Sequence, residues 1–279
     1  MNDEVYSHGH HSSVVGAHAR RTATDSAAYL VPHLRPGFRV LDVGCGPGTI
    51  TCGLAALVAS PDGSGHATGL DRSEEVVAHA RRLASEQGAR GVDFAAGNIY
   101  DLPFGDGTFD VVHAHQVLHH LVDPVAALRE MRRVARPGGI VAVREADYGA
   151  MSWYPQLPEL DQWRAVYEKT SRSNGAEPNA GRHLLEWAIA AGFGPDELEP
   201  SASVWLYATE ARRREHGLSW AERVLESGYA DQALERGFAT AEDLERISAG
   251  WRSWTADPGA LFLMPSTEIV ATKPLEADA

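Results

Sequence analysis

The strongest constraint on the fold is a regular alternation of short apolar runs with helical periodicity in the first half of the sequence. Apolar runs of strand length occupy residues 38–43, 66–70, 92–96, 109–114 and 139–144, and helical patterns occupy 49–59, 73–87 and 124–135. Strands connected through helices of this length make right-handed crossovers and form a parallel sheet with helices on both faces. We therefore expect a doubly wound α/β core.

The pattern changes after Asp147, where long helical stretches replace the alternation and all seven tryptophans occur. Helices are predicted at 157–173 and 182–191, strands at 198–207 and 261–271, and a mostly helical insertion at 209–256. A leading helix is predicted at 22–34. The expected fold is a doubly wound, seven-stranded, mostly parallel Rossmann-like sheet with helical lid insertions. Its expected parts are an N-terminal lid and leading helix (1–34), a core (35–147), helices with strand six (148–208), a helical lid (209–258), and the last strand and tail (259–279).

Three glycines at alternate positions, Gly44, Gly46 and Gly48, lie directly between the first predicted strand and its helix. Ligands of open parallel sheets bind outside the carboxyl ends of the strands, where this loop lies. Glycine permits positive φ angles and a close approach of the backbone to a ligand. Asp71 closes the second strand, where a carboxylate can accept hydrogen bonds from two ribose hydroxyls. The combination predicts a cofactor that contains a nucleoside.

The loop departs from two common phosphate-binding patterns. A dinucleotide fingerprint needs its third glycine at position 49, and a P-loop ends in Gly-Lys-Ser/Thr. This chain has Thr49 where the dinucleotide fingerprint needs its third glycine, and the loop has no Gly-Lys-Ser/Thr ending. NAD and FAD therefore fit poorly, which disfavours a dehydrogenase.

Five motifs keep the order of a known family. They are residues 40–49 (VLDVGCGPGT), 69–73 (GLDRS), 97–104 (GNIYDLPF), 109–112 (FDVV) with 117–121 (VLHHL), and 133–139 (RVARPGG). Together they resemble class I S-adenosylmethionine-dependent methyltransferases over about residues 38–145, and most of all the ubiquinone and menaquinone biosynthesis type. The resemblance implies S-adenosylmethionine as cofactor and a small-molecule methyl acceptor, in secondary metabolism or quinone-like biosynthesis.

The same resemblance implies which residues surround the cofactor. They are Asp42, Gly44 and Gly46 at the methionine end, Asp71 at the ribose, Arg72, Asn98 and Ile99 at the adenine, and His115 and Gln116 near the methionine moiety or the methyl group. Many relatives carry an acidic residue at the position of Asn98. Asparagine still accepts a hydrogen bond through its carbonyl oxygen, so we expect binding to survive.

The sulfonium methyl group is already activated, so the protein must align a nucleophile and, for many substrates, remove a proton. The candidate bases are His8, His10 and His11 near the N-terminus, Glu145 and Asp147 after the fifth strand, and His115. Of these we select His11 and Glu145 as the catalytic candidates. Tyr148, Trp153 and Tyr154 follow the fifth strand and are the candidate substrate-binding residues, whereas we expect most other tryptophans to be structural.

Composition limits the partners. The 25 Lys+Arg against 38 Asp+Glu give a net charge of −13, which disfavours nucleic acids and anionic membranes. Two cysteines, Cys45 and Cys52, cannot build a disulfide framework or a four-cysteine zinc site, and we expect no metal. No stretch approaches the ~20 apolar residues of a membrane span. We expect a cytoplasmic enzyme whose added helices serve a homodimer as readily as a lid. A protein methyltransferase, a non-catalytic cofactor-binding module, and the acceptor atom (O, N or C) stay open.

Overall fold

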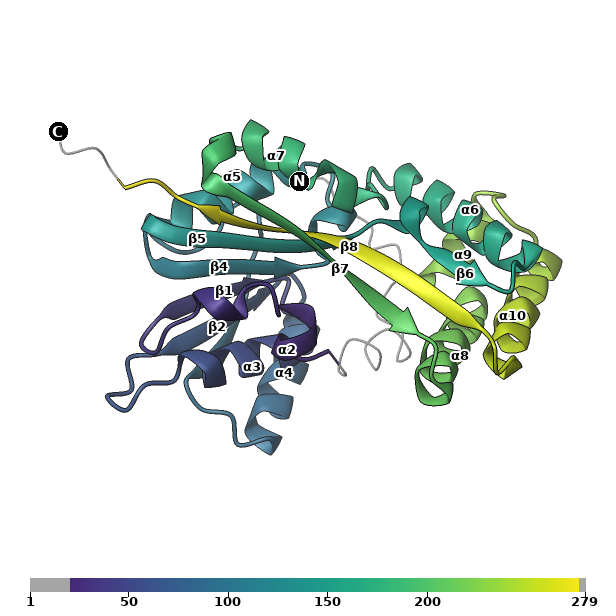
Figure 1. Cartoon of the computed structure of the whole chain (residues 1–279), viewed down its shortest axis with the longest axis horizontal. Coiled ribbons are helices and arrows are strands. Elements are labelled where there is room, and N and C mark those ends of the chain that lie inside the picture. Colours follow the sequence, from purple (N-terminus) through teal and green to yellow (C-terminus); the bar gives the residue numbers. More distant parts are fainter. Residues whose placement is uncertain (1–20, 276–279) are drawn as a thin grey trace.

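The computed structural model describes residues 21–275 and shows one mixed sheet of eight strands (Figure 1). The strands are β1 (Arg39–Val43), β2 (His66–Asp71), β3 (Val92–Ala96), β4 (Phe109–His115), β5 (Ala135–Ala146), β6 (Ser152–Tyr154), β7 (Leu198–Tyr207) and β8 (Leu261–Thr272). Their order is β3-β2-β1-β4-β5-β8-β6, and β7 also pairs with β8. Strands β1 to β5 are parallel, whereas β8 runs antiparallel to β5, β6 and β7. The seven predicted strands and the mostly parallel core are confirmed.

Helices cover both faces of the parallel strands, because successive side chains of a strand point to opposite faces. On one face, Leu41 and Val43 pack with residues of α5 (Pro124–Val134) and α7 (Leu184–Ala190). On the other face, Val40 packs with α3 (Thr49–Val58) and with the segment around α2 (Ala23–Ser26). The next helix, α4 (Glu74–Glu86), packs against Phe94 of β3. Because β1, β2 and β4 run parallel, the loops at their carboxyl ends lie together at one edge of the sheet.

The leading segment differs from its prediction. A continuous helix over 22–34 is wrong: α2 ends at Ser26, and a separate 3-10 turn follows at Val31–His33. Pro32 within that turn has no backbone N–H and disfavours a helical conformation in the residue before it. Ala27 and Leu30 are nevertheless fully buried. The apolar spacing therefore marked the buried side of this segment, while its backbone follows turns instead of one helix.

A short eighth strand, β6, was not predicted. It spans three residues, Ser152–Tyr154, and pairs antiparallel with β8, so that Trp153 lies opposite Phe262. Only Trp153 of the three is buried. Three residues are too few to show the alternation by which a strand is recognised in a sequence.

The helical part beyond β6 forms a second core, rich in aromatic side chains. It consists of α6 (Pro158–Ser173), α8 (Glu210–Glu226), α9 (Gly228–Glu235) and α10 (Ala241–Ala256), all at the end of the molecule that is distant from β1 (Figure 1). Trp163, Trp251 and Trp254 are fully buried there, and the rings of Trp163 and Trp251 meet edge to face with centroids 5.0 Å apart. The expectation that most tryptophans are structural holds for Trp251 and Trp254, which line neither cavity. Within residues 21–275, no helix has the length and apolar character needed to cross a membrane.

Candidate active site

The loop after β1 is shaped by glycines in the left-handed region. Gly44 and Gly46 have φ angles of 69° and 53°. The backbone N–H groups of Gly44 and Cys45 both donate to the carbonyl of Leu70, at 2.7 and 3.0 Å, which fixes the loop against the end of β2. A Cβ at Gly44 would lie 2.4 Å from Val117, whereas a Cβ at Gly46 would meet nothing within 4 Å. The backbone at Gly46 therefore borders open space.

A small cavity of about 30 Å³ adjoins this loop. Its walls include four of the residues predicted to bind the cofactor, namely Asp42, Gly44, Gly46 and His115, and also Arg21, Cys45, Pro47, Thr49 and Ile50. The open space at Gly46 lets a ligand approach the backbone of this loop, which is consistent with the cofactor that the motifs imply.

Asp71 lies at the end of β2, next to the same loop. Its Oδ2 accepts from the N–H of Gly46 at 3.1 Å, and its Oδ1 accepts from the N–H of Ser73 at 3.0 Å. Asp71 thus links the loop after β1 to the start of α4. A half-buried carboxylate in this place can accept hydrogen bonds from two ribose hydroxyls, and the assignment of Asp71 to the ribose stays a prediction.

The carboxylate of Asp42 has a different set of contacts from the one expected. Its Oδ2 accepts from Thr51 Oγ1 at 2.6 Å and its Oδ1 lies 2.7 Å from His113 Nδ1, and all three residues are buried. Asp42 therefore joins β1 to α3 and β4 beneath the glycine loop. It borders the small cavity, but both of its carboxylate oxygens are engaged within the protein.

The residues expected at the adenine follow β2 and β3, the next strands along the sheet. Arg72 and Asn98 are exposed, and Ile99 is half-buried. The Oδ1 of Asn98 accepts from the N–H of Tyr100 at 3.1 Å. None of the three lines the small cavity. Their assignment to the adenine stays a prediction.

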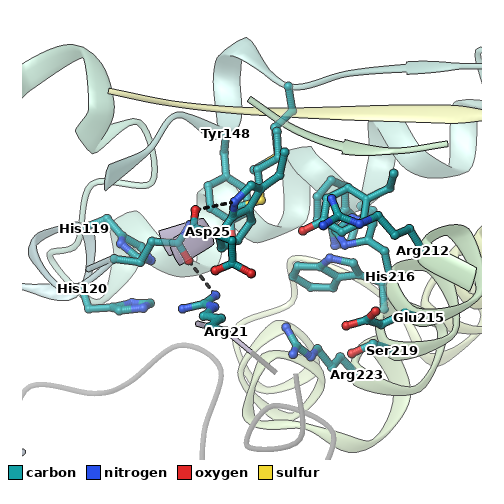
Figure 2. A pocket seen from close by; sticks show the side chains of 17 residues that line it. Arg21, Asp25, His119, His120, Tyr148, Arg212, Glu215, His216, Ser219 and Arg223 are labelled. Carbon is teal, nitrogen blue, oxygen red and sulfur yellow. Dashed lines mark hydrogen bonds between the residues drawn. The ribbon is translucent and has the colours of Figure 1, made fainter. Parts of the chain in front are cut away.

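A larger cavity of about 200 Å³ lies beside the first one. Figure 2 shows Arg21, His119 and His120 on one side of it, and Arg212, His216 and Ser219 of α8 on the other. Arg21 lines both cavities. Its Nη2 donates to Gln116 Oε1 at 2.7 Å, and its guanidinium group lies 5.4 Å from the ring centroid of Trp205. Arg21 and Gln116 therefore lie at the boundary between the cofactor cavity and the larger cavity.

Glu145, a predicted catalytic residue, is fully buried and supports its neighbours. Its Oε1 accepts from the N–H groups of Val117 and Leu118, both at 2.7 Å. Its Oε2 lies 2.6 Å from Nδ1 of His119, which lines the larger cavity. A carboxylate accepts hydrogen bonds, so Nδ1 of His119 donates its N–H to Glu145. This contact favours the tautomer of the imidazole in which Nε2 carries the lone pair. The structure thus connects Glu145 to the cavity only through His119.

The three candidate substrate-binding residues separate in the structure. Tyr148 lines the larger cavity, and its ring stacks on Tyr167 at 4.2 Å. Burial raises the pKa of the Tyr148 hydroxyl, so it stays protonated. Trp153 packs on Phe262, with ring centroids 5.6 Å apart, and Tyr154 is 59% exposed. Neither Trp153 nor Tyr154 lines either cavity.

Other candidates lie elsewhere. His8, His10 and His11 fall outside the described residues. Asp147 forms a two-pronged ion pair with Arg182, with both N–O distances 2.7 Å, so its carboxylate is engaged.

Sequence reasoning did not select three residues that line the larger cavity: His119, Trp205 and His216. His119 lies in the VLHHL motif, which was a usable signal. The other two come from β7 and α8, and nothing local in the sequence places these elements beside the loop after β4.

Comparisons with known proteins identify the family of this chain. A family described as a methyltransferase domain matches residues 34–193. A methyltransferase of Schizosaccharomyces pombe is 37% identical over 274 residues, which covers 96% of this chain and 96% of the relative. The 2-phytyl-1,4-naphtoquinone methyltransferase of Synechococcus elongatus is 34% identical over 57% of this chain and 72% of its own length.

Among solved structures, phosphoethanolamine N-methyltransferase 2 of Haemonchus contortus, in complex with S-adenosylhomocysteine, has the same fold. Its TM-score is 0.55 at 19% identity, over 90% of this chain and 52% of that one. The family match, the full-length relative and the glycine loop beside Asp71 lead to one conclusion: this chain belongs to the methyltransferase domain family and is a class I S-adenosylmethionine-dependent methyltransferase.

Proposed function

We propose that this enzyme transfers the methyl group of S-adenosylmethionine to a small molecule bound in the larger cavity. The observation that carries the proposal is the position of His119, held by Glu145 at the wall of a cavity that shares Arg21 with the cofactor site. The cavity of about 200 Å³ is smaller than the ~300–1,000 Å³ of sites for drug-sized ligands, which suits an acceptor of one or two rings. The net charge of −13 disfavours a nucleic-acid acceptor.

His119 is the proposed general base. The cofactor supplies an electrophilic methyl group on a sulfonium sulfur. When the cofactor is bound, the acceptor atom would bond to that methyl group as the methyl carbon–sulfur bond breaks and S-adenosylhomocysteine leaves. The acceptor's proton would pass to Nε2 of His119, and the carboxylate of Glu145 would stabilise the resulting imidazolium. A positioned base of this kind contributes about 10²–10⁴-fold to the rate. Glu145 is a positioning residue in this scheme, which revises its expected role as the base.

The helical lid predicted at 209–258 fits this arrangement. Helix α8 supplies Arg212, His216 and Ser219 to the cavity wall opposite His119 (Figure 2). We propose that this segment covers the bound acceptor and excludes water during transfer. The naphthoquinone methyltransferase among the relatives makes an aromatic ring a reasonable acceptor, in secondary metabolism or quinone-like biosynthesis.

The test uses S-adenosylmethionine labelled on its methyl group. Purified protein is incubated with a panel of hydroxylated naphthalenes and benzoates, and in separate arms with casein and with total RNA. Label in the small-molecule fraction alone supports the proposal. Label in casein would identify a protein methyltransferase, and no transfer to any arm despite S-adenosylmethionine binding would favour the non-catalytic module; either result contradicts the proposal.

The role of His119 is tested with the best acceptor of that panel. His119→Ala should lower kcat by about 10²–10⁴-fold while the affinity for S-adenosylhomocysteine changes little. The matched control is His183→Ala, a histidine that lines neither cavity. Equal rates for His119→Ala and wild type would remove His119 from the chemistry.

A further inference from the structure

The walls of the larger cavity contain buried polar atoms that no described residue satisfies. They are Nε2 of Gln116, Nε1 of Trp163, Nε2 of His216 and Oγ of Ser219. Each is shielded from water and has no hydrogen-bond partner among residues 21–275. Buried polar atoms in folded proteins nearly always have a partner, because leaving one unsatisfied is unfavourable. A bound molecule can supply the missing partners.

Two of these atoms can only donate. The indole N–H of Trp163 has no acceptor function. At Gln116, Arg21 donates to Oε1, and a guanidinium group never accepts, so the orientation of the amide is fixed and Nε2 is a donor. Both atoms therefore need an acceptor, such as an oxygen of the bound molecule.

The backbone of Gln116 is also unusual. Its φ angle of +54° is the only positive value for a non-glycine residue in the described part of the chain. The N–H of Gln116 donates to the carbonyl of Arg144 at 2.8 Å, which holds this conformation at the end of β4. Strained backbone of this kind concentrates at ligand sites, where the fold maintains it to place a side chain. The strain at Gln116 is consistent with an amide positioned for a ligand.

The unsatisfied atoms come from two sides of the cavity. Gln116 follows β4, in the loop that carries His119, and Figure 2 shows His119 opposite His216 and Ser219 of α8. Trp163 lies on the side of α8, because its ring and the ring of His216 both contact Trp251 and Phe262. The ring of His216 stacks on Tyr207 at 4.0 Å, and burial lowers its pKa to about 3, so it is neutral in ordinary buffers.

Aromatic rings complete the walls of the cavity between these two sides. Tyr148, Trp205 and Trp220 line it together with the residues above. Flat rings of this kind favour a planar aromatic occupant, which can stack on them or meet their edges.

We propose that the methyl acceptor is a planar aromatic molecule with oxygen atoms at opposite ends of its ring system. Gln116 binds the oxygen nearer the cofactor, and Trp163, His216 and Ser219 bind the oxygen at the far end. The inference rests on the proposed function, since it names the class of molecule that occupies the same cavity. It adds three residues that set specificity and that the sequence motifs did not assign, Trp163, His216 and Ser219, and it gives Gln116 a contact with the acceptor.

The test compares two probes by calorimetry. One is 6-hydroxy-2-naphthoate, with oxygens at both ends of the ring system, and the other is 2-naphthol, with an oxygen at one end. Each is titrated into the protein alone and into protein saturated with S-adenosylhomocysteine. We expect saturable binding of the hydroxynaphthoate and at least about tenfold weaker binding of 2-naphthol, because 2-naphthol lacks the oxygen that Trp163, His216 and Ser219 bind and so loses at least one hydrogen bond of ordinary strength.

Variants locate the binding. Trp163→Phe keeps a ring and removes the N–H, and Ser219→Ala removes the hydroxyl; each should weaken the hydroxynaphthoate about five- to tenfold. The matched controls are Trp251→Phe and Ser171→Ala, whose buried polar atoms also lack partners among the described residues but do not line the cavity. These controls should bind the hydroxynaphthoate as the wild type does.

Three results would overturn the inference: equal affinities for the two probes, no binding of either probe, or equal losses in the cavity variants and their controls. The first step of the titration separates this failure from failure of the proposed function. Protein that binds S-adenosylhomocysteine and methylates another small acceptor, yet shows one of these three results, keeps its proposed function and loses only the acceptor class.

Discussion

The substitution Glu145→Gln tests the link between the buried carboxylate and catalysis. Its shape matches that of glutamate, so the glutamine Oε1 can still accept from the N–H groups of Val117 and Leu118. The reverse orientation would point the amide NH₂ at two backbone donors and is disfavoured. The NH₂ group therefore faces Nδ1 of His119, which then must accept instead of donate. The imidazole proton moves to Nε2, and the lone pair needed for proton removal is lost.

The expected size of the effect follows from these contacts. Losing the base lowers kcat by about 10²–10⁴-fold. Three hydrogen bonds to a charged group become bonds to a neutral one, which costs roughly 1–3 kcal/mol of folding free energy. The protein should still fold, because every buried donor at the site keeps an acceptor or finds one. Glu145→Ala is a poorer test, since it leaves two buried backbone N–H groups unsatisfied.

The assay measures kcat and KM, together with S-adenosylhomocysteine affinity and urea unfolding. Glu145→Gln should lower kcat while KM and the affinity for S-adenosylhomocysteine change little, because His119 loses its free Nε2 lone pair and the cofactor cavity is left intact. Glu130→Gln is the matched control, because Glu130 also accepts a backbone N–H, that of Leu102, but lies outside both cavities. A kcat within about twofold of wild type would refute the reasoning. Parallel losses of kcat and cofactor affinity would reduce Glu145 to a structural role.

Two further predictions concern cofactor binding and acid stability. Asp71→Asn places an amide NH₂ toward one of two backbone donors, the N–H of Gly46 or of Ser73, and should weaken S-adenosylhomocysteine binding at least about tenfold by calorimetry. The control is Asp93→Asn, which changes an exposed carboxylate. Equal affinities of Asp71→Asn and the wild type would contradict the assignment of Asp71 to the ribose. Burial lowers the pKa of His216 from 6.5 to about 3. Between these pH values the unfolded chain binds a proton that the folded chain does not. The free energy of unfolding therefore falls as the pH falls, by up to about 2 kcal/mol at pH 4.5. His216→Phe should flatten the decline in the urea midpoint between pH 6.5 and 4.5, and an unchanged slope would count against this assignment.

The strands of the core were predictable because each carries its own signal. An apolar run bounded by turn residues marks a buried strand of a parallel sheet, and β1 and β4 lie where such runs predicted them. The backbone of the leading segment could not be predicted in this way, because Ala27 and Leu30 show helical spacing in the sequence yet lie in turns. The strand β6 escaped because three residues hold no period.

The site was predictable only where function is local to a loop. Gly44, Gly46 and Asp71 can be recognised in the sequence because they lie at the ends of two predicted strands. The structure places them next to one another. The contact between Glu145 and His119 joins residues 26 positions apart and depends on how β5 lies beside β4. Trp153 was predicted to line the substrate pocket because it follows β5, but its side chain packs in the aromatic core, against Phe262 of β8. Such choices are made by tertiary packing, which no short segment encodes.

We expect the glycine loop and Asp71 to bind S-adenosylmethionine as the methyl donor. The most direct measurement is a calorimetric titration of the purified chain with S-adenosylhomocysteine and, separately, with NAD. We expect saturable binding of S-adenosylhomocysteine at one site per chain and no binding of NAD. Saturable binding of NAD without binding of S-adenosylhomocysteine would contradict it, and the loop after β1 would have to be assigned to hydride transfer.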